Sequence, residues 1–235
     1  DTPCRIGGPA RGDEAMRTTT DRRGEFVLGT VNNCAMGVTP WGTYLTCEEN
    51  FNGYFKGPPA PSADQKRYGL TEKGFGFRWH EHDERFDATR HPNEVNRFGW
   101  VVEIDPWRPE QQPVKRTALG RFKHEGATAT LARDGRVVVY MGDDERFEYV
   151  YKFVSHDRYR AGNPGNARLL DAGTLYVARF DDDGKGRWLP LRHGEKYPNG
   201  ALTADNGFTS QGEVVIRCRQ AADLAGATKM DRPEW

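Results

Sequence analysis

The chain has 235 residues and a mass of 26.6 kDa, the size of one large domain or two small ones, which excludes a large multidomain assembly. Lysine and arginine number 34 and aspartate and glutamate also 34, so no global basic field is available to hold nucleic acid or an anionic membrane. The mean hydropathy of -0.82 is polar, but 11% aromatic residues argue against disorder, and 27 glycines with 14 prolines favour short strands over a helical bundle.

The first half of the chain predicts short strands on either side of a long irregular stretch. Residues 23–30 and 42–48 are β-prone and flank NNCAMGVTPW, whose Asn, Gly and Pro favour a loop. Residues 50–97 are rich in Gly, Pro and charge without a sustained period, which is typical of a functional or mobile segment. Residues 98–104 predict the next strand, with 114–119 as its antiparallel neighbour.

The second half carries the strongest β signal. Residues 126–132 and 136–141 are joined by Asp-Gly, the preferred two-residue hairpin connection, and a polar GDDERFE turn leads to residues 149–154. These three runs predict a meander. Residues 173–180 and 187–191 predict a further hairpin closed by DDDGKG.

One helix is predicted, over residues 210–224, where Ser210 and Glu213 fit a capping box and the apolar residues share one face. Successive meanders with one late helix predict an all-β fold, a β-propeller with irregular blades or part of one, as a single domain over residues 1–235. No run of about 18 apolar residues occurs, so no membrane-spanning segment is predicted.

Candidate chemistry lies where predicted strands end. Cys34 and the pair Glu48-Glu49 belong to neighbouring loops, and a thiolate beside hard oxygen ligands suits a transition metal next to a harder cation. The competing interpretation is a buried free cysteine and a solvated acidic pair.

Two further acidic motifs flank the meander. Glu125 lies in KHEGA before it, and Asp143-Asp144 lie in GDDE at its first turn. Acidic turns are commonly solvated, and whether Glu125 and Asp144 converge depends on a strand direction that the motifs leave open.

The segment KMDRPEW follows the predicted helix. Arg232 offers a planar bidentate donor for phosphate or carboxylate, and Glu234 can ligate a cation on the same side of an extended segment. A surface ion pair between these two residues is the alternative.

Long, unusual strings resemble the PhoX-type bacterial alkaline phosphatases over nearly the whole chain: NNCAMGVTPWGTYLTCEENFNGYF, NRFGWVVEIDPW, KRTALGRFKHEGA, YMGDDERFEYVYKFVS, GTLYVARFDDDGKGRWLPL and ATKMDRPEW. The resemblance implies a periplasmic or secreted phosphomonoesterase on a β-propeller, exported by the twin-arginine route. It also implies a mixed cluster of Fe3+ and Ca2+ that acts on small organic phosphate monoesters, and a monomer at full length.

Carried over motif by motif, the resemblance assigns Cys34 as the thiolate ligand to iron. It assigns Glu49, Glu125 and Asp144 as carboxylate ligands to iron or calcium, Glu234 as a calcium ligand and Arg232 as the clamp on the substrate phosphate. Glu48 is the alternative to Glu49, and Asp143 is the alternative to Asp144.

Family members run longer than this chain, which starts at Asp1 without an initiator methionine and stops at Trp235. We therefore expect a piece of a longer protein, with C-terminal blades missing, an incomplete propeller and an incompletely assembled site. Two other functions stay open: a non-catalytic, calcium-stabilised propeller scaffold, and a calcium-dependent propeller hydrolase of lactonase or phosphotriesterase type. Both would tolerate Cys34→Ser.

Overall fold

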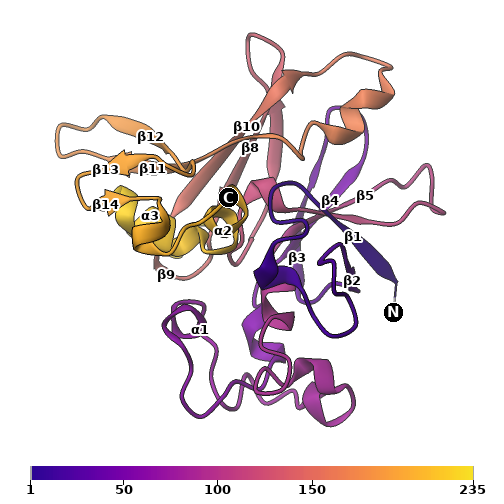
Figure 1. The fold of residues 1–235 in the computed structure, drawn as a ribbon. Helices are drawn as coiled ribbons and strands as arrows, with labels where there is room; N and C mark the ends of the chain where they lie inside the picture. Colours follow the sequence, from indigo (N-terminus) through magenta and orange to yellow (C-terminus); the bar gives the residue numbers. More distant parts are fainter. Residues whose placement is uncertain (1, 235) are drawn as a thin grey trace.

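A computed structural model describes residues 2–234, and two open β-sheets dominate it (Figure 1). The first sheet contains β1 (Pro3–Gly7), β2 (Phe26–Leu28), β3 (Asn33–Val38), β4 (Tyr44–Glu48), β5 (Val101–Ile104) and β6 (Val114–Arg116). Its strand order is β2-β1-β6-β5-β4-β3, and only the β1–β6 pair within it is parallel. The predicted antiparallel pairing of the fifth and sixth strands is confirmed.

The second sheet is antiparallel throughout. It contains β7 (Thr128–Leu131), β8 (Arg136–Gly142), β10 (Val150–Arg158), β11 (Gly173–Phe180) and β12 (Gly186–Pro190). Its order is β12-β11-β10-β8-β7, so the predicted meander and the predicted hairpin are confirmed and form one continuous sheet.

Short elements complete the described residues. The ribbons pair β13 (Lys196–Tyr197) with β14 (Gly200–Ala201), and β9 (Arg146–Glu148) with β15 (Met230–Asp231). The α-helices are α1 (Ala63–Arg67), α2 (Gln211–Ile216) and α3 (Cys218–Ala225). Single 3-10 turns occupy residues 14–16, 51–54, 79–81, 84–86, 94–97, 117–119, 164–168 and 204–206.

The prediction of one late helix is wrong, because Arg217 interrupts it. The backbone of Arg217 adopts φ -103° and ψ 40°, outside helical values, and separates α2 from α3. Ser210 does cap α2 by accepting a hydrogen bond from the Glu213 amide. The Glu213 carboxylate, however, accepts from the amide of Thr209 rather than from that of Ser210, so the capping box is not reciprocal.

The chain is mostly β, as predicted, but the sheets of residues 2–234 are open and separate and form no closed ring of blades. Two strands of the first sheet escaped prediction, as did the short strands of the two ribbons. Residues 3–7 form β1 at the inside of the first sheet, and the expected loop after residue 32 is instead β3, paired with β4 through a bulge. Pairing with a neighbouring strand has overridden the local turn preference of Asn, Gly and Pro there.

Two hydrophobic clusters stabilise this arrangement. The larger packs the second sheet against α2 and α3 around Phe122, Tyr151 and Phe153. The smaller packs the first sheet against the segment between β4 and β5, around Phe51, Phe98 and Trp100. That segment, drawn in purple and magenta in Figure 1, is irregular as predicted and is held in place by aromatic burial rather than by long elements.

The two sheets meet where β3 approaches β7. The Ala35 amide donates to the Glu125 carbonyl at 2.9 Å, and a Cβ on Gly37 would lie 1.9 Å from the Ala127 carbonyl oxygen, so only glycine permits this approach. The junction brings the Cys34 strand beside the KHEGA segment. No helix among residues 2–234 has the length and apolarity that a bilayer crossing requires.

Candidate metal centre

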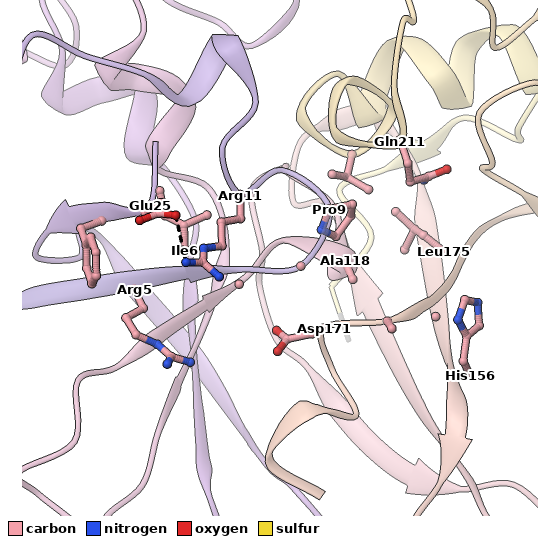
Figure 2. A pocket seen from close by; sticks show the side chains of 16 residues that line it. Arg5, Ile6, Pro9, Arg11, Glu25, Ala118, His156, Asp171, Leu175 and Gln211 are labelled. Carbon is pink, nitrogen blue, oxygen red and sulfur yellow. Dashed lines mark hydrogen bonds and ion pairs between the residues drawn. The ribbon is translucent and has the colours of Figure 1, made fainter. Parts of the chain in front are cut away.

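Two cavities stand out as possible sites, and the first offers little chemistry. A cavity of about 510 Å³ lies between the sheets, with Arg5, Arg11, His156 and Asp171 among its lining residues (Figure 2). Its acidic groups are already paired within the protein, since Arg11 donates to Glu25 at 2.9 Å and Asp171 accepts from Arg116 at 2.6 Å. The acidic groups that lack a cationic partner among residues 2–234 lie at a different site.

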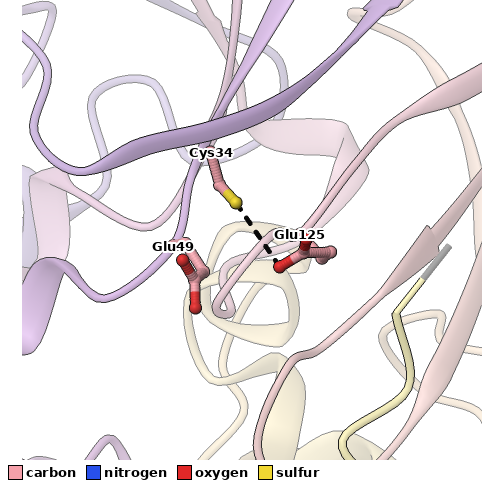
Figure 3. Close-up of side chains that lie close together, drawn as sticks. All are labelled: Cys34, Glu49 and Glu125. Atoms are coloured by element: carbon pink, nitrogen blue, oxygen red, sulfur yellow. Dashed lines mark hydrogen bonds between the residues drawn. The ribbon is translucent and has the colours of Figure 1, made fainter.

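Cys34, Glu49 and Glu125 form a compact cluster at the sheet junction (Figure 3). One ligand atom from each residue lies within 4.8 Å of the other two, and the Cys34 thiol donates to Glu125 Oε2 at 3.4 Å. Cys34 comes from β3, Glu49 follows β4 directly, and Glu125 precedes β7. The structure therefore brings together three residues from motifs that are far apart in the sequence.

Asp144 joins this cluster from the end of β8, so the two acidic motifs flanking the meander do converge. The charge of Asp144 acts on both Glu49 and Glu125, and its Oδ1 is buried without a hydrogen-bond partner among the described residues. A buried polar atom left unpaired is costly, and a cation bound at this point would satisfy it.

The cluster is electrostatically unfavourable without a cation. Burial and the charges of Asp144 and Glu125 raise the pKa of Glu49. Burial and the charges of Asp144 and Glu234 raise the pKa of Glu125. Burial, the hydrogen bond from Cys34 to Glu125 and the nearby carboxylates raise the pKa of Cys34 to about 11.

Thiolate and carboxylates are the deprotonated forms that bind metal ions, and a bound cation reverses this repulsion. One soft sulfur donor with several hard oxygen donors fits a transition metal beside an oxygen-preferring cation such as Ca2+. The residues present therefore fit the group that the resemblance implies.

Each of the two acidic pairs divides its members between the interior and the cluster. Glu48 is fully buried and accepts from Lys115 Nζ at 2.7 Å, whereas Glu49 faces Cys34. Asp143 is likewise fully buried and accepts from Arg219 at 2.6 Å, whereas Asp144 faces the carboxylates of the cluster. The geometry thus separates the alternatives that the motifs left open and places Glu49 and Asp144 at the candidate site.

Arg232 lines a cavity of about 570 Å³ together with Glu49 and Asp144. It follows β15 and adopts a left-handed backbone with φ 49°, an uncommon conformation that is often found at functional sites. Arg232 forms no ion pair with any residue between 2 and 234, so the alternative of an Arg232–Glu234 surface pair is not observed among them. Glu234 instead lies close enough to act on the pKa of Glu125.

Sequence reasoning missed three residues of this region. Asn32 also has positive φ, at 48°, and donates to Glu49 Oε2 at 3.3 Å. Lys66 lines the same cavity as Arg232, from α1 within the stretch that gave no periodic signal. Arg219 reaches the cavity from α3, and the sequence pattern predicted a helix there without indicating a role for this residue. Asn32 had a local signal, since it lies two residues before Cys34.

The comparisons with known proteins identify the family of the chain. The family model described as alkaline phosphatase PhoX matches residues 1–235, and no curated protein matches the chain. A solved structure of Pseudomonas fluorescens PhoX in complex with vanadate, described as a transition state analogue, is 54% identical with a TM-score of 0.94. The alignment covers 100% of this chain and 42% of that chain. This protein therefore belongs to the alkaline phosphatase PhoX family.

Proposed function

We propose that the chain forms part of an alkaline phosphatase that hydrolyses small organic phosphate monoesters to inorganic phosphate. The observation that carries the proposal is the cluster of Cys34, Glu49 and Glu125, of which Glu49 also lines a cavity with Arg232. The vanadate described for the Pseudomonas fluorescens relative as a transition state analogue supports phosphoryl chemistry in this family.

We propose Fe3+ and Ca2+ as the ions. Cys34 would bind iron, because a thiolate prefers the softer metal, and Glu49, Glu125, Asp144 and Glu234 would supply oxygen ligands to iron or calcium. When bound, such ions provide Lewis acidity toward the phosphoryl oxygens and generate a nucleophile from water. The chain's own contribution is to hold one sulfur and several oxygens at a single point where two sheets meet.

Arg232 is proposed to bind the substrate phosphate. Its guanidinium can donate two parallel hydrogen bonds to two phosphate oxygens, which fixes the orientation of the ester. Lys66 lies on the wall of the same cavity and adds positive potential for an anionic substrate. Contacts made to the negative charge on the phosphoryl oxygens in the transition state would lower the barrier.

The wider proposal concerns the architecture and the setting. The antiparallel runs β3-β4-β5-β6 and β7-β8-β10-β11-β12 are blade-like, which supports residues 1–235 as one partial β-propeller domain. We propose export to the periplasm or the medium and a monomer at full length, with small phosphate esters rather than nucleic acid as partners.

Cys34 in the cluster favours the phosphatase over the two alternative functions. Neither the calcium-stabilised scaffold nor the calcium-dependent hydrolase needs a thiolate.

The test measures metal content and turnover together. Purified chain is analysed for iron and calcium and assayed with a chromogenic phosphate monoester at alkaline pH, beside Cys34→Ser. We expect iron and calcium in the unmodified chain and loss of iron in Cys34→Ser. Retention of iron by Cys34→Ser would contradict the proposal. The absence of both metals and turnover in the unmodified chain would contradict a metal site that these residues assemble by themselves.

Arg232→Ala tests the phosphate clamp, with Arg187→Ala as a control. Arg187 is also an exposed arginine, but it pairs with Asp181 in a distant hairpin turn. Inhibition by inorganic phosphate should weaken by about tenfold or more in Arg232→Ala, as expected for the loss of a charge-assisted bidentate contact, and should not change in the control. Unchanged phosphate inhibition in Arg232→Ala would remove this role.

A further inference from the structure

We infer that Arg219 is a positioning residue for the candidate metal centre: its guanidinium holds Asp143, which links the two turns that carry Asp144 and Glu125 and fixes their separation. The inference rests on the proposed function, because it assumes that these carboxylates bind metal. Arg219 itself lies behind the carboxylates, on α3, and does not belong to the ligand set.

Arg219 holds Asp143 in a bidentate pair that excludes water. Its Nε donates to Asp143 Oδ2 at 2.8 Å and its Nη2 to Asp143 Oδ1 at 2.6 Å. The side chain of Arg219 is 1% exposed and that of Asp143 is 0% exposed. Two parallel bonds from a planar donor set both the distance and the angle of the carboxylate, which a single bond does not.

Asp143 passes this constraint to both turns. Its own backbone precedes Asp144 directly, and its Oδ1 also accepts from the Lys123 amide at 3.2 Å. The Asp144 amide donates to the Lys123 carbonyl at 3.0 Å, and the Glu125 amide donates to the Gly142 carbonyl at 3.4 Å. The turn after β8 and the KHEGA segment are thus bound to each other, with the guanidinium at their junction.

Two further contacts of the Arg219 Nη1 extend this arrangement along the cavity. It donates to Glu145 Oε2 at 2.9 Å and to the Arg67 carbonyl at 3.1 Å. Lys123 Nζ lies 3.0 Å from the same Glu145 oxygen. A displacement of Arg219 would therefore also displace Glu145 and Arg67, which both line the cavity with Arg232.

A buried arginine elsewhere provides a matched control. Arg116 is also almost fully buried, donates to Glu103 at 2.7 Å and to Asp171 at 2.6 Å, and lies on β6, away from the candidate site. Arg219→Lys and Arg116→Lys both keep the charge and remove the planar fork. Both should lower the melting temperature, whereas only Arg219→Lys should affect metal binding.

The experiment titrates Ca2+ into the metal-stripped chain by calorimetry and determines iron and calcium content after loading. Loss of a residue that orients metal ligands weakens metal affinity by about 10- to 100-fold, so Arg219→Lys should weaken Ca2+ binding by at least about tenfold. Arg116→Lys should stay within about twofold of the unmodified chain. Asp143→Asn, which retains the shape and one acceptor, gives the same test if Arg219→Lys does not fold.

Equal Ca2+ affinities of Arg219→Lys and the unmodified chain would overturn the inference and leave the proposed function intact. The same losses in both lysine variants would also overturn it, because they would reduce Arg219 to a general stabilising residue. An unmodified chain that binds neither metal would refute both the inference and the proposed metal site of these residues.

Discussion

Lys115→Met breaks a buried ion pair and should destabilise the fold strongly. Lys115 Nζ lies 2.7 Å from Glu48 Oε1 with both side chains fully buried, donates to the Arg97 carbonyl at 2.9 Å and lies 4.0 Å from the centroid of the Phe98 ring. Methionine fills a similar volume, so the substitution mainly removes the charge. The carboxylate of Glu48 is then left in the interior without its cation.

The structure limits how much this costs. Removing one partner of a buried pair typically costs about 3 to 5 kcal/mol. Glu48 keeps three backbone donors, the amides of Val31 at 3.2 Å, Gly99 at 3.0 Å and Trp100 at 3.1 Å, which continue to stabilise its charge. We therefore expect the lower end of the range, about 3 kcal/mol, for the single substitution.

Urea unfolding of the metal-stripped chain measures this cost without a contribution from ligand binding. The transition midpoint should fall with an unchanged slope. Lys115→Met combined with Glu48→Gln should recover about 2 kcal/mol, since no buried charge remains, and the coupling is read from a double-mutant cycle. A loss below about 1 kcal/mol for the single variant, or simple additivity, would refute the reasoning.

The remaining predictions concern single positions. Gly37→Ala should lower the melting temperature by several degrees, because its Cβ would lie 1.9 Å from the Ala127 carbonyl and force the sheets apart; an unchanged melting curve would show that the junction yields easily. Gly142→Ala should keep the fold but weaken phosphate inhibition, because its Cβ would lie 1.9 Å from the Pro233 carbonyl and displace the segment beside it; normal inhibition would argue against this. Burial alone would raise the pKa of Asp223, but hydrogen bonds from an arginine and a tyrosine lower it. The stability that ionised Asp223 contributes to the fold is therefore present above its ordinary pKa of 3.8 and is lost as the pH falls through the lower pKa of the folded state. Asp223→Asn should therefore make the free energy of unfolding fall less steeply at acidic pH.

Local sequence was sufficient to predict an element where the conformation of that element depends on its own residues. The run over 136–141 reads as a strand because its residues are β-prone, and the hairpin before it forms as predicted. Of the predicted Asp134-Gly135 connection, only Gly135 has positive φ, at 84°, and its amide donates to the Ala132 carbonyl. The strand over 173–180 has the predicted bounds. The candidate site residues were likewise readable as motifs, since thiolate, carboxylate and guanidinium chemistry belongs to residue type and short spacing.

Tertiary structure decided which acid of each pair faces the site and which strands pair. Neighbouring residues at a strand end point in opposite directions, so Glu48 and Glu49 cannot both turn toward Cys34. The choice depends on where Lys115 and Arg219 lie, and these cations come from parts of the chain far from the carboxylates that they neutralise. β3 is a strand for the same reason, because hydrogen bonds to β4 outweigh the turn preferences of its own residues. Burial free energy and long-range pairing are properties of the assembled fold, so a local sequence pattern cannot predict them.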